Sequence, residues 1–390
     1  MYDFCINGGG MVGSALALGL AQQGHRVAVI EHQRPQPFAA DQTPDIRVSA
    51  ISLASVNVLK KLGAWQVIEQ WRSRAYTGLS VWESDSARTD FDAELLGEPH
   101  LGYFVENRLV QLGCHQVLNT LPNADCFFDT QVASSQRDGQ CMAVSLKNGD
   151  TLTCRFLVGA DGARSVVREL AGVGTSGWQY AQHALGIIAQ FDLPVAPVTW
   201  QQFWPQGPRA LLPMYDNMAS LIWYDNKATV EELNRLENRA LKERLSQAFL
   251  QLDTQTNDFK VLNKARFPLT RSHATHYVKP GYILVGDAAH TINPLAGQGV
   301  NLGFKDVATL LDVTQETPPG HAGFYRALQA QYATPRRRDN LMMMTAMDAF
   351  YLTFSNNITP LKFIREGALK LAQVVTPAKR EVLKYATGLK

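Results

Sequence analysis

A glycine-rich turn close to the N-terminus constrains the fold of this chain more than any other feature. Gly8, Gly10 and Gly13 follow an apolar segment, residues 2–6, and lead into a second one, residues 11–20. Glycines at this spacing let the backbone approach a pyrophosphate closely, and the N-terminus of a helix offers it free N–H groups. The order of strand, turn and helix therefore predicts a βαβ unit that binds a dinucleotide.

A second apolar strand, expected at residues 27–30, ends in Glu31. Glu31 lies 18 residues after Gly13, close to the spacing of about 20 at which a carboxylate accepts hydrogen bonds from a ribose. The alternative is a glycine turn without a ligand, but the ordered context favours the ligand. Asn7 ends the first strand, where its polar side chain needs a hydrogen-bond partner.

The composition is that of a globular enzyme rather than of a disordered or nucleic-acid-binding chain. A length of 390 residues favours two domains, the hydrophobic content of 46% indicates a globular protein, and a net charge of only +2 gives no overall sign of nucleic-acid binding. The five cysteines are scattered without a Cys-x-x-Cys pair, so we expect no metal site and a reducing compartment. Without a signal peptide or a membrane-length apolar run, a cytoplasmic location is expected.

A second glycine-rich segment, residues 286–301, begins where an apolar strand expected at residues 282–285 ends. It opens with Gly286 and Asp287, contains a proline, and leads into a helix expected from Gln298 onwards. Such a turn can hold a flavin ring, because N–H groups at a helix start stabilise the negative charge of the reduced ring. The two glycine turns are therefore expected to hold the two ends of one dinucleotide.

Helical and extended segments are interleaved, so that no single stretch contains a whole cofactor domain. Helices are expected at 52–62, 107–121 and 231–249, a hairpin at 142–158 turning at 147–150, and extended or antiparallel β structure at 81–91 and 183–224. We therefore expect an α/β fold. Its parts are a cofactor domain in three pieces (1–75, 101–180, 271–330), an inserted antiparallel β domain (76–100, 181–270) and a helical C-terminal region (331–390).

Three motifs occur in a fixed order along the chain. They are Gly8-x-Gly10-x-x-Gly13, Asp161-Gly162, and Gly286-Asp287-Ala288-Ala289-His290 followed by Pro294. In this order they resemble the motifs of the FAD-dependent aromatic hydroxylases related to para-hydroxybenzoate hydroxylase. The runs 9–13, 45–52, 105–107 and 294–301 are similar to the ubiquinone-biosynthesis branch of that family, and the stretches 200–203, 207–209 and 354–357 to one member of the branch.

The resemblance implies a Rossmann-like FAD-binding domain and a substrate domain made of the inserted β-sheet. It implies a monooxygenase that uses oxygen, by way of a flavin hydroperoxide, to hydroxylate the ring of a polyprenyl benzoquinol. NAD(P)H or another donor would reduce the FAD transiently, since the sequence holds no second dinucleotide fingerprint. A flavoenzyme that does not insert oxygen, and a scaffold subunit of the biosynthetic complex, are the alternatives.

The resemblance also implies roles for single residues. Arg47 would contact the FAD pyrophosphate, with a surface salt bridge as the alternative. Asn107 would lie near the adenosine half or cap a helix. Asp161 and Gly162 would form a turn beside the pyrophosphate, although Asp161 is equally suited to cap the next helix.

In the second glycine segment, Asp287 would accept a hydrogen bond from a ribityl hydroxyl. Pro294, Gly297, Gln298 and Gly299 would form the catalytic edge of the flavin site. His290 is interpreted as a packed structural residue rather than an acid or base. The cofactor contacts expected overall are Gly8, Gly10, Gly13, Glu31, Arg47, Asn107, Asp161, Gly162, Gly286, Asp287, Pro294, Gly299, Val300 and Asn301.

Two further features concern the partners of the chain. Aromatic and apolar residues could line a substrate pocket, although the core of a sheet is the favoured interpretation for each: Trp200, Phe203, Trp204, Leu212, Trp223 and Tyr224. Residues 360–390 carry seven Lys/Arg and two Glu, a net charge of +5. An amphipathic helix there could lie on the inner membrane or pack on the catalytic domain or on another biosynthetic protein.

Overall fold

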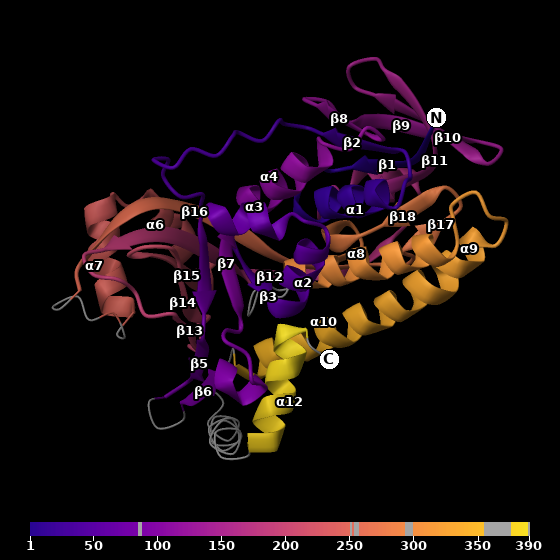
Figure 1. Ribbon diagram of the computed structural model, residues 1–390. Coiled ribbons are helices and arrows are strands. Elements are labelled where there is room, and N and C mark those ends of the chain that lie inside the picture. Colours follow the sequence, from indigo (N-terminus) through magenta and orange to yellow (C-terminus); the bar gives the residue numbers. More distant parts are fainter. Residues whose placement is uncertain (85–87, 250–251, 253–256, 293–298, 355–375, 389–390) are drawn as a thin grey trace.

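The computed structural model describes the chain except residues 85–87, 250–251, 253–256, 293–298, 355–375 and 389–390. Two large sheets lie on opposite sides of the molecule, a small third sheet lies between them, and long helices run beneath the first sheet (Figure 1). Pieces of each sheet come from segments far apart in the sequence. The expected α/β class, with a discontinuous cofactor domain and a helical C-terminus, is confirmed.

Among the described residues, the first sheet has the order β17-β18-β11-β1-β2-β8, with β10 and β9 continuing from β11. Strand β1 pairs in parallel with both β11 and β2, and β11 pairs in parallel with β18. The carboxyl ends of these strands therefore share one edge, which is where open α/β sheets bind ligands. The strands are β1 (Tyr2–Asn7), β2 (Val27–Glu31), β8 (Ala124–Phe128), β9 (Val132–Asp138), β10 (Cys141–Leu146), β11 (Thr151–Gly159), β17 (Val278–Lys279) and β18 (Tyr282–Leu284).

Helices pack against this sheet and enclose the largest apolar core. Helix α1 is buried from Gly13 to Ala21, as expected for a helix that is apolar all round. The helices of this part are α1 (Met11–Gln22), α2 (Leu53–Lys61), α3 (Trp65–Gln70), α4 (Asn107–Leu118), α5 (Val166–Leu170) and α8 (Gly299–Glu316), with the short η3 (Gly286–Ala288). The third sheet lies between the first sheet and the second (Figure 1). Its strands are β3 (Val48–Ser52), β7 (Gly102–Glu106) and β4 (Ser73–Tyr76), and β4 is followed along the chain by a strand of the second sheet.

The second sheet has the order β19-β16-β12-β15-β14-β13-β5-β6. Helices α6 (Lys227–Arg235) and α7 (Asn238–Ala248) cover one of its faces and bury a separate apolar core there (Figure 1). The opposite face stays free of these helices. The strands are β5 (Gly78–Trp82), β6 (Thr89–Asp92), β12 (Thr175–Phe191), β13 (Val198–Gln202), β14 (Arg209–Pro213), β15 (Met218–Asn226), β16 (Phe259–Ala274) and β19 (His290–Thr291).

The expected element pattern is confirmed over most of the chain, with three differences. The helix expected at 231–249 is wrong, because Leu236 adopts an extended ψ of 145° and Glu237 starts a new helix. Strand β13 pairs in parallel with β5, so the second sheet is mixed rather than purely antiparallel. The long strand β16 was not expected, since Pro268 argues against a central strand, yet Pro268 lies at an irregularity in the pairing with β12.

The C-terminal region is helical. It comprises α9 (Phe324–Ala327), η5 (Leu328–Ala333), α10 (Thr334–Phe354) and α12 (Thr376–Thr387). Helix α12 packs on the 3₁₀ turn η2 (Ala93–Leu96), and Leu383 is buried with Phe91 and Leu101. For α12, packing on the catalytic domain is therefore confirmed. The apolar positions expected between 361 and 375 lie outside the described residues.

Candidate cofactor and active site

The first glycine turn is built against the turn that follows β11. A Cβ on Gly8 would lie 2.4 Å from the carbonyl oxygen of Ala160, and Gly8 has a φ of +101°. A Cβ on Gly13 would lie 1.9 Å from the carbonyl oxygen of Gly8. Only glycine fits these two positions. At Gly10, by contrast, the described residues beyond its chain neighbours place no atom within 4 Å of an added Cβ, and none of their side chains caps α1 there, so this helix start is open to an anion.

The second turn, residues 160–162, follows β11 and accounts for the polar side chains of Asn7 and Asp161. The Oδ2 atom of Asp161 accepts hydrogen bonds from the side chain of Asn7 at 2.8 Å and from the N–H groups of Val166 and Val167 at 2.8 and 3.3 Å. The expected partner of Asn7 and the capping role of Asp161 are thus confirmed. The buried Oδ1 atom of Asp161 has no partner among the described residues, as expected of a group that faces a polar ligand.

The third turn, residues 286–290, lies beside the first turn, residues 8–13. A Cβ on Gly286 would meet the side chain of Val12 at 3.4 Å, and a Cβ on Gly303 in α8 would meet Val12 at 2.6 Å. Arg168 joins the second and third turns, because its guanidinium donates to the carbonyl oxygens of Ala163 at 2.8 Å and Ala288 at 3.0 Å. Three turns that are more than a hundred residues apart therefore meet at one edge of the first sheet.

Asp287 lies where these turns meet the second sheet. Burial raises the pKa of its carboxyl, and His290 and Arg47 act in the opposite direction. The side chain of Asp287 is nevertheless exposed at the surface. Arg47 stacks on the ring of Phe267 at 5.8 Å and forms no ion pair with any residue that the structure describes, so the surface salt-bridge alternative has no support.

Glu31 lies at the end of β2 beside the first turn. Its side chain is buried, pairs with Nδ1 of His32 at 2.5 Å, and places Oε2 3.4 Å from an added Cβ on Gly9. The carbonyl oxygen of Gly9 accepts hydrogen bonds from Ser14 at 2.6 Å and from Gln111 at 2.7 Å. These two residues hold the turn from behind, and the sequence motif did not reveal them.

The two asparagines of the expected site differ from their predictions in detail. Asn107 is not the helix cap, because Glu106 holds that position and Asn107 is the first helical residue. The side chain of Asn301 is buried and contacts the β3–α2 junction. It donates to the carbonyl oxygen of Ala50 at 2.8 Å and accepts from the N–H of Ser52 at 3.0 Å and the hydroxyl of Ser55 at 2.8 Å. The cofactor contact expected at Asn301 stays a prediction.

The remaining expected residues divide into two groups. Gly299 begins α8, and Val300 packs against the main core. Pro294, Gly297 and Gln298 lie outside the described residues, so their catalytic roles stay predictions. The expected cofactor contacts in the three glycine turns lie close together at one edge of the first sheet, as far as the structure describes them.

His290 is buried, and its Nε2 atom lies 2.5 Å from Oδ2 of Asp306. The structural interpretation of His290 is thereby confirmed. Asp306 itself was missed, although a signal exists. It falls on the buried stripe of α8 between Leu302 and Leu310, where a carboxylate requires strong hydrogen-bond donors.

The aromatic residues of the second sheet belong mainly to its core. Trp223 and Trp200 pack under α6 and α7, as the favoured interpretation predicts. The free face carries Ala184, Gly186 and Ser220, and each lies opposite a larger residue of the neighbouring strand, namely Tyr224, Ile222 and Ile188. A Cβ on Gly186 would lie 3.2 Å from the ring of Phe267 and 3.8 Å from the side chain of Ile46. This face of the sheet is therefore next to Ile46 and its neighbour Arg47.

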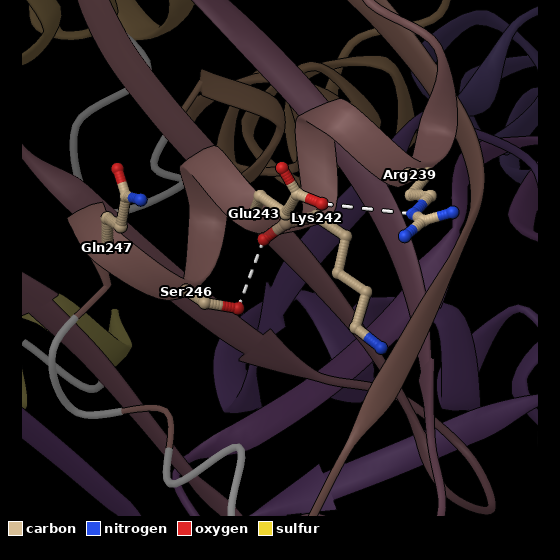
Figure 2. A pocket seen from close by; sticks show the side chains of 5 residues that line it. All are labelled: Arg239, Lys242, Glu243, Ser246 and Gln247. Atoms are coloured by element: carbon tan, nitrogen blue, oxygen red, sulfur yellow. Dashed lines mark hydrogen bonds and ion pairs between the residues drawn. The ribbon is translucent and has the colours of Figure 1, made fainter.

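A surface pocket lies elsewhere, on α7. Figure 2 shows the residues that line it, which are Arg239, Lys242, Glu243, Ser246 and Gln247. All five come from one helix on the covered side of the second sheet, away from the free face. This pocket is therefore separate from the site formed by the three turns.

The parallel sheet, the three turns and the attached mixed sheet define a dinucleotide-binding flavoprotein. The open helix start at Gly10, the unpartnered oxygen of Asp161 and the accessible Asp287 fit the two ends of FAD. Residues 1–342 match the family described as FAD binding domain, and the chain belongs to this family. It is an FAD-dependent monooxygenase.

The chain is similar in sequence to two ubiquinone-biosynthesis hydroxylases and in fold to a solved monooxygenase structure. The chain is 45% identical to the 3-demethoxyubiquinol 3-hydroxylase of Escherichia coli (strain K12) over 99% of this chain and 98% of that protein. It is 34% identical to the ubiquinone hydroxylase UbiL of Rhodospirillum rubrum, over 99% and 89% of the two chains. The crystal structure of p-nitrophenol 4-monooxygenase PnpA from Pseudomonas putida superposes with a TM-score of 0.80 at 18% identity, covering 99% and 98%, which shows the shared fold.

Proposed function

We propose that this monooxygenase hydroxylates the benzoquinol ring of a polyprenylated ubiquinone precursor at the demethoxyubiquinol step. The observation that carries this proposal is the 45% identity, without large gaps in coverage, to the hydroxylase of that step. The relative that is named only as a ubiquinone hydroxylase is 34% identical. Hydroxylation at another ring position is therefore the second candidate.

FAD, when bound, supplies the two-electron and oxygen chemistry of this reaction. The residues of the chain hold the cofactor and shape the space beside it. The open start of α1 at Gly10 suits the pyrophosphate, Glu31 suits a ribose, and Asp287 suits a ribityl hydroxyl. The N–H groups at the start of α8 suit the electron-rich edge of the flavin.

The free face of the second sheet supports a flat aromatic substrate. The small residues Ala184 and Gly186 lie opposite the apolar Tyr224 and Ile222, and Phe267 offers a ring beside Arg47. The hydroxyl of Ser220 is buried and has no partner among the described residues. A quinol oxygen could complete its hydrogen bonding.

The step can be tested by the quinone that accumulates in cells without this gene product. We expect the demethoxy intermediate to build up, and expression of the wild-type chain to restore ubiquinone. The purified enzyme should consume one oxygen for each hydroxylated quinol when a short-tailed demethoxyquinol is supplied. Accumulation of a less substituted ring would contradict this step and favour the second candidate.

We also propose that the enzyme meets its lipid-like substrate at a membrane surface through α10. No helix in the described part of the chain is long and apolar enough to span a bilayer. Leu341, Met342 and Leu352 are 39%, 56% and 68% exposed on the outer side of α10. Arg337 and Arg338 lie exposed at the same end as Leu341, and such a face suits anionic lipid headgroups.

The double variant L341S/M342S is expected to reduce co-sedimentation with anionic vesicles by about threefold or more, since each buried apolar side chain contributes about 1.5–3 kcal/mol. The exposed neighbour variant Thr345→Ser is the matched control. Turnover of a water-soluble short-tailed quinol should stay at the wild-type rate. Equal sedimentation of both variants would exclude this face as the membrane contact.

A further inference from the structure

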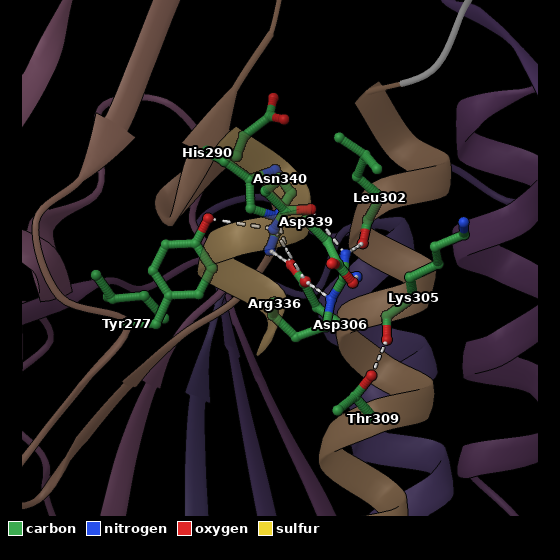
Figure 3. Close-up of polar contacts among 12 residues, drawn as sticks. Tyr277, His290, Leu302, Lys305, Asp306, Thr309, Arg336, Asp339 and Asn340 are labelled. Atoms are coloured by element: carbon green, nitrogen blue, oxygen red, sulfur yellow. Dashed lines mark hydrogen bonds and ion pairs between the residues drawn. The ribbon is translucent and has the colours of Figure 1, made fainter. Parts of the chain in front are cut away.

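The cofactor turn at residues 286–290 is tied to the C-terminal region by a buried polar cluster (Figure 3). Asp306 of α8 is fully buried at the centre of this cluster. Its Oδ2 atom accepts the backbone N–H of Gly286 at 3.0 Å and lies 2.5 Å from Nε2 of His290. Its Oδ1 atom accepts from Nε of Arg336 at 2.8 Å and from the side chain of Asn340 at 3.4 Å.

Arg336 is the cation of this cluster and comes from α10. Besides Asp306, its guanidinium donates to the side chain of Asn340 at 2.7 Å and to the backbone carbonyl of Leu302 at 3.3 Å. The side chain of Arg336 is only 5% exposed. A guanidinium is suited to this place, because its planar array of donors engages several acceptors at fixed angles.

Three ionic side chains meet in the cluster, because Arg336 also lies 3.3 Å from the carboxylate of Asp339 at its outer edge. Nδ1 of His290 is buried without a hydrogen-bond partner among the described residues. Burial alone would raise the pKa of Asp306, but His290 and Arg336 outweigh it and hold this pKa below its usual range.

We propose that Arg336 is a positioning residue for the flavin. It holds Asp306 in place, and Asp306 in turn fixes the N–H of Gly286 and the ring of His290 on either side of Asp287. In this way α10 sets the position of the Asp287 carboxylate, which is expected to contact the cofactor, relative to the start of α8. This role does not depend on which ring position of the substrate is hydroxylated.

The first test is Arg336→Met, which keeps an unbranched apolar stem and removes the guanidinium donors. We expect the dissociation constant of FAD to rise at least tenfold. At saturating FAD, we expect a shifted visible spectrum and a shifted midpoint potential of the bound flavin. Arg338→Met is the matched control, because Arg338 is exposed on the same helix; it should match the wild type in all three readouts. Arg336→Lys keeps the charge and should give an intermediate FAD affinity.

The double variant R336M/D306L distinguishes a role of Arg336 in stability alone from a role in positioning the flavin. The single variant leaves a buried carboxylate without its cation, which is strongly destabilising, whereas removing both charges is often nearly neutral. The melting temperature should therefore recover in the double variant, while FAD affinity and the flavin spectrum stay altered because Gly286 and His290 have lost their anchor. If Arg336→Met does not fold, the double variant alone decides. Wild-type FAD affinity and spectrum in a folded R336M/D306L would overturn the proposal.

Discussion

Gly10→Ala is expected to abolish tight FAD binding while leaving the apoprotein as stable as the wild type. In the part of the chain that the structure describes, no atom beyond the neighbouring residues lies within 4 Å of a Cβ at this position, and Gly10 has an ordinary φ of −71°. The substitution therefore harms only what binds at the open start of α1. We expect the dissociation constant of FAD to rise about a hundredfold, which corresponds to about 2.7 kcal/mol. Thermal melting of the apoprotein and a fluorescence titration with FAD measure the two effects separately.

Gly13→Ala provides the contrasting case. Its Cβ would lie 1.9 Å from the carbonyl oxygen of Gly8, so the apoprotein itself should lose about 1–3 kcal/mol of stability through overpacking. If Gly10→Ala bound FAD with wild-type affinity, the pyrophosphate would not pass over the start of α1. The assignment of the first turn would then be wrong.

Asp287→Ala is expected to raise the dissociation constant of FAD about thirtyfold, or about 2 kcal/mol, and to stop hydroxylation at low FAD. The carboxylate stands accessible where the three turns meet, and truncation leaves the ligand hydroxyl without its acceptor. Asp287→Asn keeps an acceptor oxygen and should lose less affinity. Product formation and FAD affinity should fall together in the alanine variant.

The pH dependence gives an independent check on Asp287. Desolvation raises the pKa of this carboxyl above its usual range, so it takes up its proton at a higher pH than an unperturbed aspartate does. As the pH falls through this raised pKa, the charged acceptor is lost and FAD affinity should decrease. Asp287→Asn should remove this acid-side loss, and the exposed Asp312→Asn on α8 should retain it. An identical pH profile in Asp287→Asn and the wild type would contradict the role of the carboxylate.

The secondary structure near the glycine turns followed closely from the sequence, because its causes are local. Strand β1, helix α1 and strand β2 lie within two residues of their expected bounds. The break between α6 and α7 did not, since buried leucines continue at helical spacing across Leu236 and neither glycine nor proline marks the break. Strand β16 was hidden for a related reason, because its pairing with β12 stabilises a segment whose own composition argues against a strand.

The candidate site divides in the same way. The sequence by itself predicted which backbone turns form the candidate dinucleotide site, because glycines, a strand end and a helix start restrict the chain within a few residues. Only the tertiary structure decided which side chains hold those turns in place, such as Arg168 across two turns and Arg336 behind Asp306. These contacts join residues that are distant along the chain, and their energy comes from burial and pairing that no local pattern records.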